Sequence, residues 1–167
     1  MEQYQELIMN MMDHERFNAH RIQHFLKVYE FARLIGTGEE VSERLMHILS
    51  IAAITHDIGI KASEEKYGDC TGEHQEQEGP DVARPMLEAL GYEEAIIDRV
   101  CYLIGHHHTY HDIDGMDYQI LIEADFLVNM SENHMGIEAC RSIYERIFRT
   151  TTGKRICRRM YAVREEK

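Results

Sequence analysis

The strongest constraint on the fold is a helical spacing of apolar residues that recurs along almost the whole chain. Near the N-terminus this spacing is i, i+3, i+4, i+7 and i+8, in the residues Tyr4, Leu7, Ile8, Met11 and Met12. Residues at these intervals share one face of a helix. No segment keeps the alternation of apolar and polar residues that indicates a strand. The sequence therefore predicts an all-α fold.

Helix start and stop signals divide the chain into further elements. Asn18 is a good N-cap and Gly36 a good C-terminal stop, and Ser42 opens the next apolar segment. Loops are expected in the polar, glycine-containing segments 61–73 and 108–116. The remaining helices are predicted over 18–36, 42–56, 74–90, 93–105, 117–132, 136–149 and 153–162. A chain of 167 residues suits one domain, so a single domain over 1–167 is expected.

The charge balance restricts the partners that the chain can bind. It has 18 Lys and Arg against 30 Asp and Glu, a formal net charge of −12. Such a surface repels the phosphates of nucleic acids and of anionic membranes, so we expect neither as a partner. A phosphorylated small molecule would bind only where the field is locally inverted, which bound divalent cations achieve.

The cysteines and the N-terminus favour a cytoplasmic protein. The cysteines form no C-x-x-C pair, which favours reduced thiols, and they are Cys70, Cys101, Cys140 and Cys157. No apolar run approaches the roughly 20 residues of a membrane span. The N-terminus carries acids instead of the basic start of a signal peptide. The methionine-rich first helix leaves open whether it packs on its own core or on a second copy in a homodimer.

A His-Asp pair carries the main chemical signal. His56 and Asp57 follow the apolar run 48–54, where burying an imidazole and a carboxylate is costly without a partner. One partner that satisfies both is a metal ion. His24 lies within the second predicted helix, and Asp125 lies in a very apolar helix where an aspartate is a poor helix former. These residues are candidate ligands of one site.

Other candidates lie near helix ends. His74 lies near the start of one predicted helix, and the run His106 to His108 ends another. Successive helical residues are about 100° apart, so one or two of these three histidines are expected to bind and the others to face elsewhere. Lys61 lies five residues beyond His56, either as a phosphate contact or as a surface lysine. The basic residues of the tail are more simply a solvated helix face than a phosphate site, and they are Arg146, Arg149, Lys154, Arg155, Arg158 and Arg159.

The ligand types indicate the kind of metal. Imidazole and carboxylate together suit divalent manganese, iron, cobalt, nickel or zinc. No cysteine lies near the cluster, so a structural cysteine-rich zinc site is not expected. A catalytic site with one or two metal ions fits better, because such an ion lowers the pKa of bound water.

The order His … His-Asp … Asp, all on helices, resembles the HD-domain superfamily of metal-dependent phosphohydrolases. The matching residues are His24 in Arg21-x-x-His24, His56-Asp57 in the string HDIG, and Asp125 in the tripeptide Glu-Ala-Asp. The resemblance covers about 18–130 and leaves 131–167 as a C-terminal helical extension. It implies an HD-type helical bundle with His24, His56, Asp57 and Asp125 around one metal.

The dinuclear branches of the superfamily imply a second metal. His74, ahead of Gly79, resembles the first extra ligand, with a spacing one residue longer than expected. His107, in Ile104-x-x-His, resembles the second, with His106 as its nearest rival and His108 as the third choice. In that arrangement Asp57 bridges the two metals.

The resemblance implies a phosphohydrolase that acts on a small phosphate ester or anhydride, expected to be a nucleotide, by attack of metal-bound hydroxide. Asp57, His56 and Lys61 are then the candidate catalytic residues. The chain lacks the H-D-x-x-E-D string of the guanosine tetraphosphate hydrolases and the G-Y-P signature of the cyclic-di-GMP branch. The alternatives are a di-iron oxygenase on the same scaffold and a nucleotide-sensing module without turnover.

Overall fold

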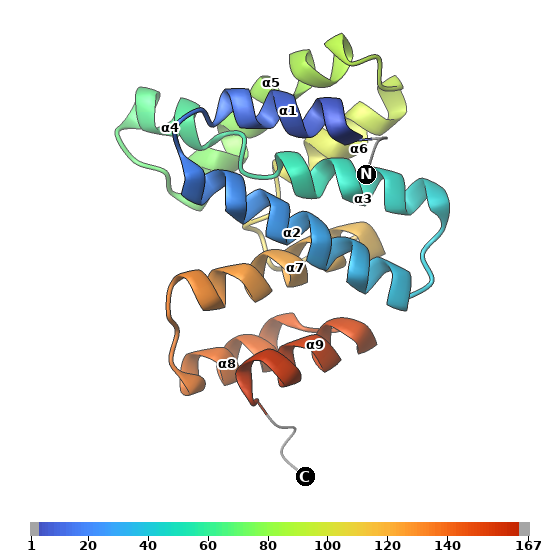
Figure 1. Cartoon of the computed structure of the whole chain (residues 1–167), viewed down its shortest axis with the longest axis vertical. Helices are drawn as coiled ribbons and strands as arrows, with labels where there is room; N and C mark the ends of the chain where they lie inside the picture. Colours follow the sequence, from blue (N-terminus) through green and yellow to red (C-terminus); the bar gives the residue numbers. More distant parts are fainter. Residues whose placement is uncertain (1–3, 164–167) are drawn as a thin grey trace.

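The computed structural model describes residues 4–163, and the regular structure in this part of the chain is entirely helical. The all-α prediction is therefore confirmed. Nine helices follow one another in this range (Figure 1): α1 (Gln5–His14), α2 (Ala19–Gly38), α3 (Glu43–Thr55), α4 (Ile60–Tyr67), α5 (Gly72–Ala89), α6 (Glu94–Ile104), α7 (Met116–Glu132), α8 (Ile137–Ile147) and α9 (Thr151–Tyr161).

Side-chain caps fix the starts of several helices. The side chain of Asn18 accepts a hydrogen bond from the backbone N–H of Arg21 at 3.1 Å, and that of Ser42 accepts one from Leu45 at 3.2 Å. Each cap satisfies a backbone N–H that has no partner within its own helix. The second and third helices thus begin where the sequence predicts them to begin.

The prediction of a loop over 61–73 is wrong, because α4 occupies most of that segment. Its residues include Lys, Ala and Glu, which are strong helix formers although they are polar. Gly68 ends the helix in the left-handed conformation, with φ of 78°. The connection to α5 is therefore short. In contrast, the expected loop over 108–116 is confirmed and extends from the end of α6 to the start of α7.

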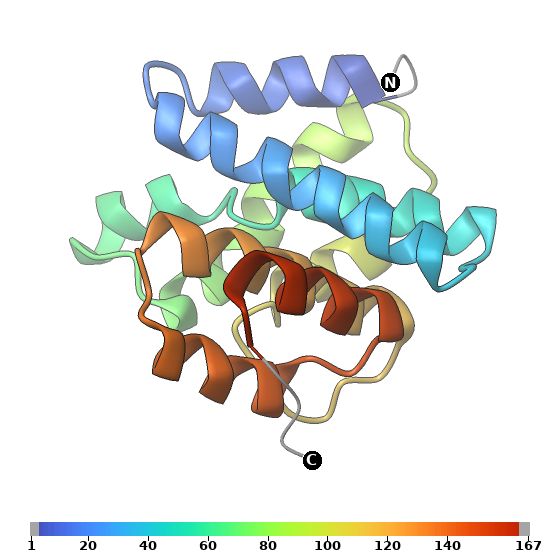
Figure 2. The ribbon, with the colours of Figure 1, turned by 60° about the horizontal axis from the view of Figure 1, so that its bottom comes forward.

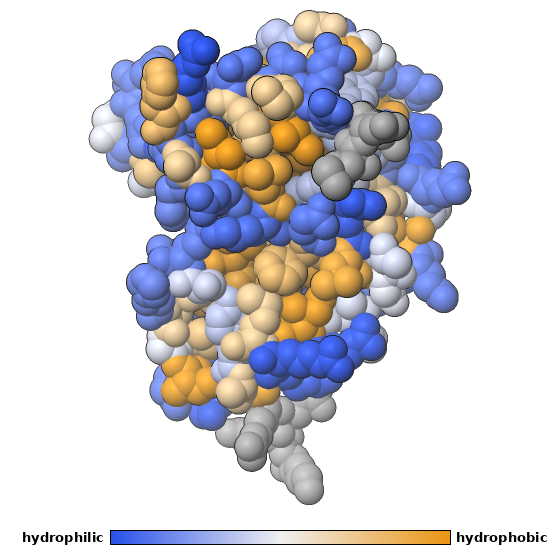
Figure 3. All heavy atoms as spheres, viewed as in Figure 1, coloured by the Kyte–Doolittle hydropathy of each residue, from blue (hydrophilic) through white to orange (hydrophobic). Residues whose placement is uncertain are grey.

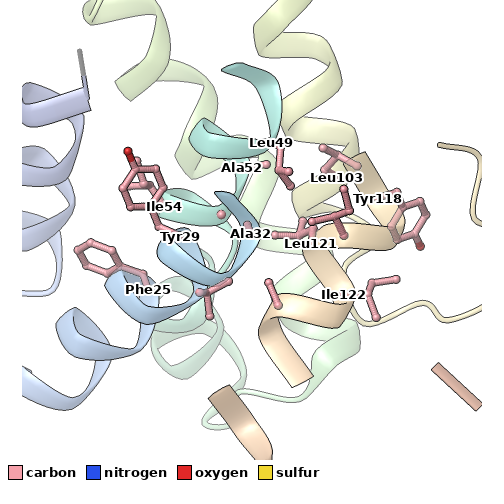
Figure 4. Packing of buried hydrophobic residues seen from close by; sticks show 14 of the residues in the cluster. Phe25, Tyr29, Ala32, Leu49, Ala52, Ile54, Leu103, Tyr118, Leu121 and Ile122 are labelled. Carbon is pink, nitrogen blue, oxygen red and sulfur yellow. The ribbon is translucent and has the colours of Figure 1, made fainter. Parts of the chain in front are cut away.

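The centre of the fold is built by α2, α3 and α7. Helix α2 packs against α3 on one side and α7 on the other, and α1, α5 and α6 lie beyond α3 (Figure 1). From residue 48 to its end α3 is buried all round, which explains why this helix is apolar on every face. Phe25, Tyr29, Leu49 and Leu121 are among the side chains that meet in this core (Figure 4).

The segment Glu43–Tyr67 is long and apolar enough to be considered as a membrane span by length and composition alone. The core helix of a soluble protein passes the same test, and 61% of the best window is buried inside this fold. The segment is also divided by the turn between α3 and α4. On the face shown in Figure 3, apolar areas lie between bands of hydrophilic residues.

A buried carboxylate attaches the C-terminal helices to the centre. Helices α8 and α9 pack on α7, and α9 also contacts α2 (Figure 2). Glu123 of α7 is fully buried and accepts hydrogen bonds from the backbone N–H groups of Arg149 and Thr150 at 2.6 and 2.9 Å. Gly153 leaves the space that this carboxylate needs, because a Cβ atom there would lie 1.9 Å from Glu123 Oε2.

Candidate metal centre

Four of the candidate ligands meet in one cluster at the centre of the fold. His24 comes from α2, His56 and Asp57 from the end of α3, and Asp125 from α7. The Nε2 atom of His24 lies 3.2 Å from His56 Nε2, 3.3 Å from Asp57 Oδ2 and 3.1 Å from Asp125 Oδ1. Residues up to 101 positions apart in the sequence therefore direct nitrogen and oxygen atoms at one another.

Hydrogen bonds at Nδ1 fix the orientation of the imidazole rings. His24 Nδ1 lies 2.8 Å from Glu132 Oε2. The Nδ1 atoms of His56 and His107 bond to the backbone carbonyl three residues earlier, at 2.9 and 2.7 Å. With Nδ1 engaged in each ring, Nε2 is turned toward the carboxylates. Metal-ligating histidines are oriented by outer hydrogen bonds of this kind.

Asp57 links two groups of histidines through its two oxygens. Oδ2 lies 3.3 and 3.4 Å from the Nε2 atoms of His24 and His56, and Oδ1 lies 3.4 Å from His107 Nε2. The His107 side chain is 1% exposed, and among the described residues its Nε2 has no hydrogen-bond partner. A buried nitrogen without a partner is costly, and a divalent cation between these ligands would satisfy it.

The histidines and aspartates of the cluster shift one another's pKa values toward the charged forms. Burial alone would lower the pKa of His24 and His56, but Asp57 and Asp125 raise both, that of His56 strongly. Burial alone would raise the pKa of Asp57 and Asp125, but the histidines hold both well below the ordinary value. The carboxylates are therefore ionised at neutral pH, as ligands of a cation must be.

Both His107 and His108 face Asp57, while His106 does not. The ligand atoms of Asp57, His107 and His108 all lie within 4.8 Å of one another. These histidines lie beyond the end of α6, so the 100° spacing of a regular helix does not separate them. His106 turns away instead and bonds to the carbonyl of Tyr102 at 2.7 Å. Burial, together with His107, lowers the pKa of His108 to about 4, which leaves its ring neutral at pH 7.

The structure does not bring His74 into either ligand group. The buried face of α5 consists of Gln75, Gly79 and further residues at intervals of four. His74 precedes this stripe by one residue and so points away from it, stacking on Tyr67 and bonding to Asp69 at 2.6 Å. Gln75 takes the inward position, with Oε1 3.3 Å from His108 Nε2. The role of His74 as a ligand stays a prediction.

Lys61 makes its hydrogen bond outside the cluster. Its Nζ donates to the backbone carbonyl of His14 at 2.6 Å, which ties α4 to the end of α1. In the part of the chain that the structure describes, no hydrogen bond or ion pair joins Lys61 to the histidines or aspartates of the site. Its contact with a phosphate stays a prediction.

Two residues of the site were missed by the sequence interpretation. Asn129 donates to Asp125 Oδ1 at 2.8 Å, and Glu132 holds His24 from behind. Both lie on the same face of α7 as Asp125, at i+4 and i+7. This polar stripe along an otherwise apolar helix is the signal that could have found them.

The fold and the cluster together define an all-helical protein with a centre suited to divalent metals. The sequence model of the HD-domain family matches residues 21–149, which is most of the chain. The chain therefore belongs to the HD-domain family, a family of metal-dependent hydrolases that bind divalent metals. The superfamily predicted from the motif order is thus confirmed.

A solved structure supports the same fold. A predicted HD superfamily hydrolase from an uncultured Thermotogales bacterium superimposes with a TM-score of 0.68 at 23% sequence identity. The alignment covers 95% of this chain and 86% of that one. No curated protein matches the sequence. At this identity the likeness shows the fold alone.

Proposed function

We propose that the chain is a metal-dependent phosphohydrolase that acts on a small phosphate ester or anhydride, with a nucleotide as the expected substrate. One observation carries the proposal: the two oxygens of Asp57 face different histidines, and Nε2 of His107 is buried without a hydrogen-bond partner among the described residues. In this arrangement His24, His56 and Asp57 would hold one metal ion together with Asp125, whose Oδ1 lies 3.1 and 3.6 Å from the Nε2 atoms of the two histidines. Asp57, His107 and His108 would hold a second.

The ions, when bound, would supply Lewis acidity that lowers the pKa of water and offsets charge on a phosphoryl oxygen. The protein orients the ligand atoms and leaves one side of the centre accessible to the substrate. The Asp57 side chain is 22% exposed whereas that of His56 is fully buried, so a substrate reaches the centre from the side of Asp57. Glu132 and the carbonyl groups behind the histidines keep the ligand atoms directed at that side.

The test is phosphate release from a panel of nucleotides and simple phosphate esters, each with manganese, iron, cobalt, nickel and zinc. We expect release with at least one metal, and its loss in His56→Ala and Asp125→Ala. If no metal and no substrate in the panel gives release above that of these two variants, the proposal is wrong.

The same ligand set also fits the alternative of a di-iron oxygenase, because the two groups share Asp57. Oxygen consumption by iron-containing protein in the presence of a substrate, without phosphate release, would favour that alternative. A nucleotide that raises the melting temperature but is not hydrolysed with any metal would favour the sensing module. The cytoplasmic location and the homodimer stay predictions.

A further inference from the structure

A small cavity opens beside the metal centre, between the loop after α6 and the end of α8. It has a volume of about 220 Å³, and its lining includes Tyr110, Ile122, Arg146 and Arg149. Pockets that hold a whole drug-sized ligand measure roughly 300–1,000 Å³. This cavity is therefore of a size for one group of a larger molecule.

The cavity adjoins the candidate metal centre. Ile122 precedes Asp125 by three residues on α7, which is about 4.5 Å along the helix axis. Tyr110 connects the cavity with the metal centre. It lines the cavity, and its hydroxyl lies 3.4 Å from His108 Nδ1. Its ring packs against that of Phe126, with the ring centroids 5.1 Å apart. Burial, together with the nearby charges of Asp125 and Asp57, raises the pKa of this hydroxyl to about 12.

The arginines of the cavity have no carboxylate partner. Among residues 4–163, no Asp or Glu lies within ion-pair distance of Arg146 or Arg149. Arg149 is fixed at the end of α8 by hydrogen bonds to backbone carbonyls, including that of Glu145 at 3.0 Å. The Nε of Arg146 donates to the carbonyl of Ser142 at 3.2 Å, and within residues 4–163 its two terminal nitrogens make no hydrogen bond.

Two acids near the cavity, one in the loop before α7 and one in its first turn, are already engaged. Asp114 and Asp117 both bind Arg99, each at 2.8 Å. Asp112, the acid in the cavity lining, lies 3.0 Å from Nδ1 of His111. The lining holds two arginines against one aspartate, so in a chain with a net charge of −12 this concave surface is a local site of excess positive charge. Guanidinium groups in such a setting bind phosphate through charge-assisted hydrogen bonds.

We infer that this cavity binds a second phosphoryl group of the substrate, with Arg146 as its main contact and Tyr110 between it and the metal centre. The inference rests on the proposed function and adds to it a substrate class. The substrate carries two phosphoryl groups, one at the metal centre and one about a helical turn away along α7.

The test uses binding and needs no turnover. The probes are alkylene bisphosphonates, with one to five carbons between the two phosphonates, and methylphosphonate as the reference with a single group. Each is titrated calorimetrically into the full-length protein as purified. At least one bisphosphonate is expected to bind the wild-type protein about ten-fold or more tightly than methylphosphonate, which corresponds to one charge-assisted contact of about 1.4 kcal/mol.

Arg146→Gln should remove most of this advantage, because the side chain is exposed and its bonds stay within its own helix. Arg155→Gln is the matched control, since Arg155 is exposed on α9 and does not line the cavity. Metal analysis after each titration shows that no probe has extracted the metal. The inference is overturned if no bisphosphonate has an advantage in the wild-type protein, or if the advantage persists in Arg146→Gln. Failure of the proposed function would instead appear as absent phosphate release with this binding pattern intact.

Discussion

Glu132 and Asp125 hold the ring of His24 from opposite ends. Glu132 Oε2 lies 2.8 Å from Nδ1, and Asp125 Oδ1 lies 3.1 Å from Nε2. The two carboxylates are seven residues apart, which places them on the same face of α7. The other oxygen of Glu132 accepts from Lys27 Nζ at 2.8 Å. One helix thus both supplies a candidate metal ligand and orients another.

This relationship predicts that Glu132 controls metal affinity without touching the metal. Glu132→Ala should weaken metal binding by roughly 10–100-fold, as loss of an outer partner of a ligating histidine does. Glu132→Gln should cost less, because its amide oxygen can still accept from Nδ1. Competition with a chelator measures both. Glu30→Gln, at an exposed position of α2, serves as the control, and equal affinities in all three variants would rule out the role of Glu132.

Metal removal should lower the stability of the protein. A ligand that binds only the folded state at 100 times its Kd stabilises it by about 2.7 kcal/mol, which is about 5–11 °C in Tm for a chain of this size. His107→Ala should reduce this shift, because it removes the buried Nε2 that lacks a hydrogen-bond partner among the described residues. Calorimetric melting with and without added metal measures the shift. Identical shifts in the variant and in the wild-type protein would argue against His107 as a ligand.

The second ligand group predicts how metal content responds to single histidine variants. His108→Ala should lower the metal-to-protein ratio by removing a ligand from the group with Asp57 and His107. His74→Ala should change the ratio less, because its Nδ1 is bonded to Asp69 and its ring stacks on Tyr67. Elemental analysis of both variants compares them. A larger loss in His74→Ala than in His108→Ala would show that His74 is the ligand, as the family resemblance implies.

The buried carboxylate of Glu123 on α7 lies against Gly153 on α9, which predicts that substitutions at these two positions have coupled effects on stability. Glu123→Ala removes hydrogen bonds to a buried carboxylate, each worth about 1.5–3 kcal/mol, so it should destabilise the fold. Gly153→Ala should also destabilise it, because the new Cβ would collide with Glu123 Oε2. In the Glu123→Ala background the same change should cost less, because the clash with the carboxylate is gone and the close approach to Thr150 Oγ1, at 2.6 Å, remains.

Urea unfolding of the two single variants and the double variant measures this coupling, which is expected to be about 0.5–3 kcal/mol. Glu138→Ala, at an exposed position of α8, is the control for loss of a carboxylate. Strictly additive effects would show that the two side chains do not interact.

Local signals made most of the fold predictable. Caps at Asn18 and Ser42 act within one turn of helix, so the sequence shows where α2 and α3 begin. The polarity of the α4 segment indicates a loop, but the helix propensity of its Lys, Ala and Glu residues outweighs it. Propensity and polarity are separate properties, and here propensity decided the structure.

The candidate site was predictable in part. The pair His56-Asp57 and the acid at Asp125 stand out, because polar groups in apolar helices need partners. Whether His74 or His108 faces Asp57 cannot be derived from spacing. The orientation of His74 depends on a register of one residue in α5, and that of His108 depends on the path of the chain beyond α6. Glu132 contacts His24 across 108 positions, a relation that only the packing of α2 on α7 creates.

The central claim is that His24, His56, Asp57 and Asp125 form a metal site on which hydrolysis depends. The most direct test is the metal content of protein purified without added metal, measured for the wild-type chain, His56→Ala and Asp125→Ala, with helical content followed by circular dichroism. We expect bound transition metal in the wild-type protein and its loss in both variants, with the helical content retained. Unchanged metal content in both variants would contradict this claim.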